Sequence, residues 1–136
     1  MNRNIGIDFD GILCGDCPRD KDTDDEAYAD WMRNVRPIRH ARPYGVPVVI
    51  TGRLDKYRDI TQEWCQKNRQ EVVAFRFGQW ESAAQRTDIA GFKAKVCREM
   101  RLSAFVESDM RQAERIAQLA RVPVACPDAR KVYGQK

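Results

Sequence analysis

Apolar residues along the chain alternate between short continuous runs and longer stretches in which they recur every three or four positions. Short β-branched or aromatic runs are typical of buried strands, and the wider spacing is typical of amphipathic helices. The expected strands cover residues 5–7, 46–50, 71–77, 104–106 and 122–126. The expected helices cover residues 24–34, 54–68, 91–101 and 113–120. Residues 78–90 are expected to be mostly loop, and the polar tail after Pro127 is expected to fray.

Strands that alternate with helices predict a mainly parallel sheet, because right-handed crossovers place helices on both of its faces. We therefore expect an α/β fold, namely a three-layer, Rossmann-like open sheet of five strands. The 136 residues fit one domain, residues 1–136. Within it, the polar and turn-rich stretch of residues 14–45 is expected to form a small lid or insert.

Composition narrows the class of protein. No apolar run approaches the ~20 residues of a membrane span, and the N-terminus lacks the pattern of a signal peptide, so we expect a cytoplasmic protein without membrane association. The formal charge of +4 favours anionic ligands such as phosphates but is too small to predict binding to duplex DNA. Five cysteines, an odd number, are expected to be free thiols.

Polar triads directly follow three of the expected strands. They occupy residues 8–10, 51–53 and 107–109. Taken singly, each triad is as typical of an ordinary turn as of a functional site. However, ligands of open α/β sheets bind at the carboxyl ends of the strands, where all three triads are expected to meet.

Asp8 and Asp10 are the first candidates for chemistry. Two carboxylates placed two residues apart at a strand end repel each other, and a divalent cation neutralises them. Asp109 supplies a further oxygen ligand, with Glu107 as its alternative. Ligation by oxygen alone favours Mg²⁺ over Zn²⁺. Gly11 permits a tight turn that leaves backbone amides open to an anion.

A carboxylate beside a metal ion can attack phosphorus, and a second carboxylate can protonate the leaving oxygen and later activate water. Developing charge on the phosphoryl oxygens needs donors, for which Thr51 and Lys93 are the candidates. Lys95 is the alternative to Lys93. We place Gly52 and Arg53 against the substrate.

The strings DFDG, VVITGR, GFKAK and FVESD resemble, in order, the four motifs of the haloacid dehalogenase-like (HAD) superfamily. The second aspartate of the first motif is similar to that of the phosphatase and phosphotransferase branches. The resemblance implies that Asp8 is the nucleophile and a Mg²⁺ ligand. It implies that Asp10 is the general acid/base and a metal ligand through its carbonyl. It also implies that Thr51 and Lys93 bind the phosphoryl group and that Asp109 binds the metal.

The fourth motif departs from the common Gly-Asp or Asp-Asp pair, so the choice between Glu107 and Asp109 as metal ligand stays open. The short spacing between motifs resembles HAD domains that lack a cap, including small phage and bacterial domains and the phosphatase half of phage polynucleotide kinases. An open site admits the phosphate at the end of a larger molecule. We therefore expect a Mg²⁺-dependent phosphatase whose partner is a nucleotide, another phosphorylated small molecule or a nucleic-acid end.

Two other functions share these residues, a phosphotransferase and a non-catalytic binding module. The intact pair Asp8 and Asp10 disfavours the binding module. A receiver domain is disfavoured because no aspartate ends the second or third strand. The motif formed by Cys14 and Cys17 lacks the second pair of a zinc site, and His40 has no catalytic motif around it, so both are given incidental roles.

Overall fold

The computed structural model describes residues 4–18 and 25–134. The described residues form six strands: β1 (Ile5–Ile7), β2 (Val48–Leu54), β3 (Ala74–Gly78), β4 (Ala104–Val106), β5 (Val124–Cys126) and β6 (Lys131–Tyr133). Four α-helices connect them: α1 (Glu26–Asn34), α2 (Arg58–Lys67), α3 (Ile89–Glu99) and α4 (Met110–Ala120). Short 3₁₀ turns occupy Arg42–Tyr44, Asp55–Tyr57, Ala83–Gln85 and Pro127–Ala129.

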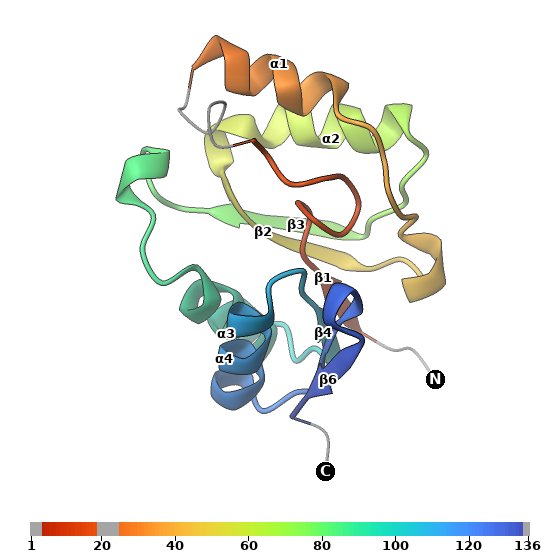
Figure 1. The fold of residues 1–136 in the computed structure, drawn as a ribbon, viewed down its shortest axis with the longest axis vertical. Coiled ribbons are helices and arrows are strands. Elements are labelled where there is room, and N and C mark those ends of the chain that lie inside the picture. Colours follow the sequence, from red (N-terminus) through yellow and green to blue (C-terminus); the bar gives the residue numbers. More distant parts are fainter. Residues whose placement is uncertain (1–3, 19–24, 135–136) are drawn as a thin grey trace.

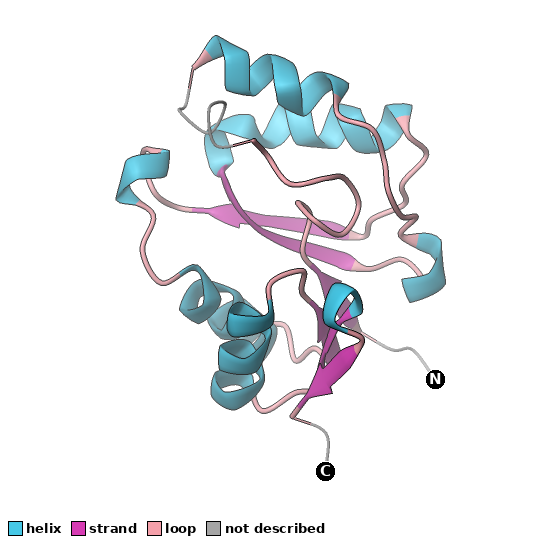
Figure 2. Cartoon of the chain, viewed as in Figure 1, coloured by secondary structure: helices cyan, strands magenta, loops and turns pink. Residues whose placement is uncertain are grey.

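The strands form one sheet in the order β3-β2-β1-β4-β5-β6, and every pair is parallel except β5 with β6. Helices α1 and α2 lie on one side of this sheet, and α3 and α4 lie on the other (Figure 1). The arrangement of helices and strands in three layers is also clear in Figure 2. The chain therefore has the expected Rossmann-like α/β fold.

Side chains of successive strand residues point to opposite layers, as the pleat requires. Val48 and Ile50 of β2 join the core under α3 and α4, whereas Val49 between them joins the core beside Trp64 of α2. In the same way, Phe105 and Val106 of β4 belong to different cores. This double burial explains why the strands are continuous apolar runs rather than alternating ones.

The expected fraying of the tail after Pro127 is wrong. Residues 131–133 form β6, which pairs antiparallel with β5 and adds a sixth strand to the expected five. Arg130 enters the left-handed region, with φ of 51°, to turn the chain back. A three-residue edge strand that contains a lysine has little apolar pattern, and such edges are common because they resist further pairing.

Two boundaries also differ from the prediction. Strand β2 begins after Pro47, which lacks a backbone N–H, and it continues through Leu54, which pairs with Gly78 of β3. Consequently, α2 begins later than expected, at Arg58. The remaining strand and helix predictions hold with shifts of a few residues at their ends.

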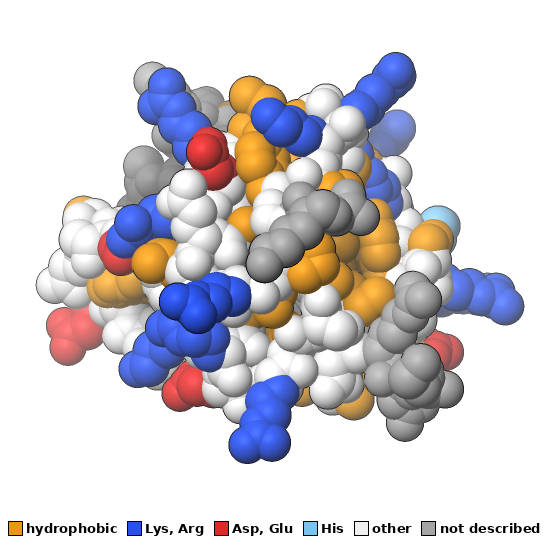
Figure 3. Space-filling model, turned by 90° about the horizontal axis from the view of Figure 1, so that it is seen from below, with side chains coloured by type: hydrophobic (Ala, Val, Ile, Leu, Met, Phe, Trp, Pro, Cys, Tyr) orange, Lys and Arg blue, Asp and Glu red, His pale blue; other side chains and the backbone are white. Residues whose placement is uncertain are grey.

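Among the described residues, no helix combines the length and the apolar character needed to cross a bilayer. On the face seen in Figure 3, lysine and arginine side chains are spread out and interspersed with acidic ones rather than gathered into one patch.

Candidate functional site

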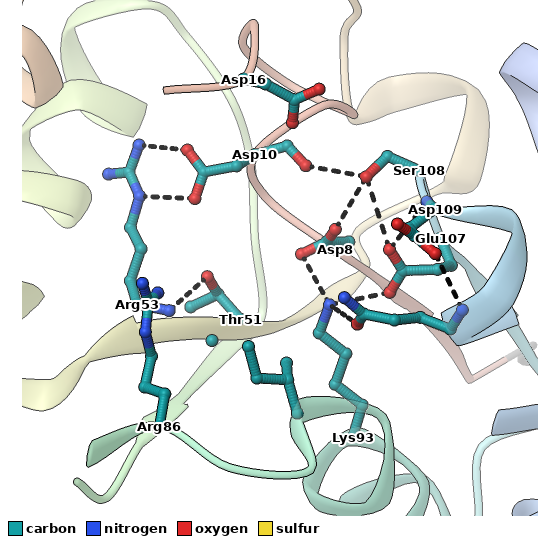
Figure 4. Close-up of a pocket in the computed structure, with 13 residues that line it drawn as sticks. Asp8, Asp10, Asp16, Thr51, Arg53, Arg86, Lys93, Glu107, Ser108 and Asp109 are labelled. Atoms are coloured by element: carbon teal, nitrogen blue, oxygen red, sulfur yellow. Dashed lines mark hydrogen bonds and ion pairs between the residues drawn. The ribbon is translucent and has the colours of Figure 1, made fainter. Parts of the chain in front are cut away.

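The carboxyl ends of β1, β2 and β4 surround a cavity of about 340 Å³ (Figure 4). All the sequence-predicted site residues line this cavity except Gly11. Parallel strands present their carboxyl ends at one edge of the sheet, which is why triads far apart in the sequence meet there. Of the described part of residues 14–45, only Asp16 lines the cavity.

Asp8 lies at the centre of the cavity floor, one residue beyond β1. Its side chain is buried, with Oδ1 accepting a hydrogen bond from Phe9 N at 2.8 Å and Oδ2 accepting one from Ser108 Oγ at 3.2 Å. Burial raises the pKa of Asp8 well above its ordinary value, and the neighbouring Glu107 and Asp10 raise it further, while Lys93 opposes the rise. The Asp8 carboxylate therefore depends on nearby positive charge to stay ionised.

Lys93 supplies positive charge from the first turns of α3. Its buried Nζ lies 2.7 Å from Glu107 Oε1, 3.1 Å from Gln112 Oε1 and 3.3 Å from Asp8 Oδ1. Burial acts to lower the pKa of Lys93, but the two carboxylates raise it above its ordinary value, so the ammonium form is favoured. Lys95 is exposed and lines a different cavity, so it does not reach this group.

Asp10 forms a bidentate ion pair with Arg53. Arg53 Nε lies 3.0 Å from Asp10 Oδ2, and Arg53 Nη2 lies 2.8 Å from Asp10 Oδ1. The Arg53 side chain is fully buried, whereas 27% of the Asp10 side chain is exposed. Arg53 therefore holds a carboxylate of the site, whereas the sequence pattern predicts that it lies against the substrate.

Two further predicted positions, Thr51 and Gly11, have specific local surroundings, and Gly52 lines the cavity beside Thr51. Thr51 is fully buried, and its Oγ1 accepts a hydrogen bond from Arg53 N at 3.0 Å. Gly11 has φ of 83°, and a β-carbon there would lie 2.6 Å from Ser108 Oγ. A side chain at Gly11 is excluded both by its backbone conformation and by the close approach of Ser108.

The fourth motif divides its three residues among three tasks. Glu107 is buried and binds Lys93 through Oε1, while its Oε2 accepts a hydrogen bond from Asp109 N at 3.1 Å. Asp109 is exposed and caps α4, with Oδ1 accepting from Gln112 N at 2.9 Å. Ser108 lines the cavity, and its hydroxyl is directed at Asp8 and Asp10 (Figure 4).

The Ser108 hydroxyl has three oxygen neighbours: Asp8 Oδ2 and Asp10 O at 3.2 Å each, and Glu107 Oε2 at 3.4 Å. A hydroxyl carries one proton, so it satisfies one of these acceptors at a time. Among the described residues, no three acidic, histidine or cysteine side chains lie close enough together to hold a metal ion. Two carboxylates, a carbonyl and a hydroxyl are nevertheless hard oxygen donors, and this donor set fits Mg²⁺.

Five residues that line the cavity were not predicted from the sequence: the apolar Ile89 and the polar Asp16, Arg86, Ser108 and Gln112. Ser108 lies within a triad that was already singled out, and Gln112 lies one helical turn after Asp109. Asp16 and Arg86 lie in loops, where no periodic pattern indicates a direction. Partial burial raises the pKa of Asp16, as do the acids around it, of which Asp10 has the largest effect.

Two of the buried cysteines contact residues of the site. Cys126 Sγ lies 3.5 Å from the carbonyl oxygen of Ser108. Cys14 is buried, and its Sγ lies 3.5 Å from Asp10 Oδ1. All five cysteines are free, as expected, and His40 is exposed in a loop.

No model of a known protein family matches this chain, and no curated protein matches its sequence. A chain from the structure of the Pnkp1/Rnl/Hen1 RNA repair complex is similar in fold, with a TM-score of 0.61 and 14% sequence identity. The match covers 91% of this chain and 42% of that one, so this chain spans less than half of that protein's length. At such low identity the likeness shows the fold alone.

Proposed function

We propose that this protein is a Mg²⁺-dependent phosphomonoesterase that acts through an aspartyl phosphate at Asp8. The observation that carries the proposal is the contact between the buried Asp8 carboxylate and Lys93, at 3.3 Å, on the floor of a cavity that Asp10 also lines. A nucleophile, a fixed cation and a second carboxylate are the groups that this reaction requires.

The charge of the cavity supports a metal cofactor. The cavity is lined by five acidic and three basic residues, so a phosphate would meet a net negative surface. Asp8, the carbonyl of Asp10 and Glu107 Oε2 are the oxygens that would hold Mg²⁺ beside Ser108, and Asp109 is the alternative ligand. Bound there, Mg²⁺ supplies a Lewis acid that offsets the charge of the phosphate.

Each residue then has a defined task in two steps. Asp8 attacks phosphorus and forms the acyl phosphate, while the bond to the leaving oxygen breaks and Asp10, which enters this step as the carboxylic acid, gives that oxygen its proton. This leaves Asp10 as the carboxylate that pairs with Arg53. Asp10 next takes a proton from water, which attacks phosphorus and releases Asp8 and inorganic phosphate. Lys93 and Thr51 stabilise charge on the phosphoryl oxygens.

The substrate we infer is a terminal phosphate of a nucleotide or a nucleic acid. A cavity of about 340 Å³ is at the small end of ligand pockets, which span about 300–1,000 Å³. It has room for the phosphoryl group and a small part of the molecule that carries it, so a larger substrate extends beyond it. The fold shared with a chain of an RNA repair complex is consistent with such a substrate.

The test is phosphate release with Mg²⁺ and with EDTA from 3′- and 5′-phosphorylated oligonucleotides, nucleoside monophosphates, sugar phosphates and p-nitrophenyl phosphate. The control is Asp8→Asn, whose amide is no nucleophile. We expect metal-dependent release that falls to background in Asp8→Asn. Full activity of Asp8→Asn would exclude the mechanism. Release that occurs only when a nucleoside or sugar acceptor is added would identify a phosphotransferase instead.

A further inference from the structure

Among the basic residues that line the cavity, Lys93 contacts Asp8, whereas Arg53 is fully buried and contacts Asp10 instead. Its guanidinium lies 4.3 Å above the centroid of the Phe9 ring, and Nη1 lies 3.0 Å from Thr61 Oγ1 in α2. Trp31 of α1 adds a second ring, 5.8 Å away. The guanidinium of Arg53 is thus held by Phe9 and Asp10, which follow β1, and by one residue from each of the helices α1 and α2.

This arrangement leaves Arg53 little contact with a substrate. Its side chain has no exposed surface, and its Nε and Nη2 donate to Asp10 while Nη1 donates to Thr61. Burying a guanidinium is costly unless it is paired. The pairing places both oxygens of Asp10 in fixed directions, since a bidentate contact restricts rotation of the carboxylate.

We propose that Arg53 is a positioning residue that acts through Asp10, holding this carboxylate in the orientation for proton transfer at the phosphoryl group. The proposal rests on the function proposed above. Helices α1 and α2 take part through Trp31 and Thr61, which both contact the guanidinium. A positioned proton-transfer group contributes roughly 10²–10⁴-fold to rate.

The test is a double-mutant cycle between Arg53→Met and Asp10→Asn with p-nitrophenyl phosphate, whose good leaving group requires little acid catalysis. In the wild-type background we expect Arg53→Met to lower kcat about 100-fold, the loss that a misplacement of about 1 Å causes, with little change in KM. In the Asp10→Asn background, Arg53→Met has no further effect, because the group through which it acts is already absent.

A second readout follows the covalent intermediate. When water activation by Asp10 is impaired, radiolabelled phosphoenzyme accumulates in both Asp10→Asn and Arg53→Met. A residue that only stabilises the fold does not change the fraction of labelled enzyme at steady state. Additive losses in the cycle, or a loss expressed only in KM, would overturn the proposal.

Two further variants distinguish a positioning role of Arg53 from a general loss of folding. Thr61→Val removes the second acceptor of Arg53, and we expect a smaller loss of kcat that also disappears in the Asp10→Asn background. Arg115→Met is the matched control: Arg115 forms an equally bidentate pair with Asp88, 3.0 Å at both contacts, with both side chains about half exposed. We expect it to retain full activity.

The two proposals fail in different ways. If wild-type protein releases no phosphate from any substrate, the proposed function fails and the positioning role falls with it. If wild-type protein is active and Asp8→Asn is inactive, but Arg53→Met and Asp10→Asn act additively, only the positioning role of Arg53 is wrong.

Discussion

Replacing Lys93 with methionine tests the electrostatics of the site without assuming any activity. Methionine has nearly the same length, so the change removes charge and hydrogen bonds while it fills most of the space. Lys93 Nζ lies within 3.3 Å of Asp8, Glu107 and Gln112, and 3% of the residue is exposed. Without it, two buried carboxylates lose their shared cation.

The expected loss is large because the carboxylates stay buried. Removing one partner of a buried ion pair costs about 3–5 kcal/mol. For a domain of this length, such a loss lowers the midpoint of thermal unfolding by roughly 10–20 °C. An exposed ion pair would give less than about 1 kcal/mol, so the magnitude distinguishes the two situations.

The loss also depends on pH, with a defined sign. Burial already raises the pKa of Asp8, and Lys93 is the group that opposes the rise, so its removal raises this pKa further. The folded variant then binds a proton that the unfolded chain releases, and its stability falls as pH rises. The deficit relative to wild type is smallest below the pKa of an unfolded carboxyl, about 4, and grows until the pH passes the pKa of the folded state.

The assay is urea unfolding monitored by tryptophan fluorescence at several pH values, without added metal. Lys95→Met is the matched control, because Lys95 is exposed on the same helix two residues away, and we expect it to unfold like wild type. A midpoint for Lys93→Met that equals wild type at neutral pH, or a deficit that is constant with pH, would refute the reasoning.

Two further predictions concern the metal and the thiols. Glu107→Gln is expected to weaken Mg²⁺ binding about tenfold or more, as the loss of a metal-site partner typically does. Asp109→Asn keeps the helix cap and is expected to change Mg²⁺ binding little. Calorimetric titration measures both affinities, and a larger loss in Asp109→Asn than in Glu107→Gln would assign the metal to Asp109. Cys17, which is partly exposed, is expected to react first with Ellman's reagent in the folded protein. Burial raises the pKa of Cys65 and Cys97 to about 12, so these thiols react only after unfolding, and rapid reaction of the folded Cys17→Ser variant would contradict this.

Much of the fold followed from local pattern. Strand β4 occupies the predicted residues 104–106, because three apolar residues between a helix and an acidic triad leave little choice of boundary. Strand β6 could not be predicted in the same way, since its three residues form a strand only because β5 offers an unpaired edge. The start of α2 likewise depends on how far β2 continues beside β3, a pairing that local pattern does not reveal.

The order of residues along the chain is enough to indicate which chemical groups gather at the site. Polar residues that follow apolar strands must meet at one edge of a parallel sheet, so Asp8, Thr51 and Glu107 are brought together by topology alone. The partner of each group, in contrast, depends on how the chain packs. Asp10 and Arg53 are separated by 43 positions, and their pairing depends on burial of the guanidinium between Phe9 and helices α1 and α2. Burial, hydrogen-bond direction and ion pairing are properties of the packed chain, and they assign each side chain its task.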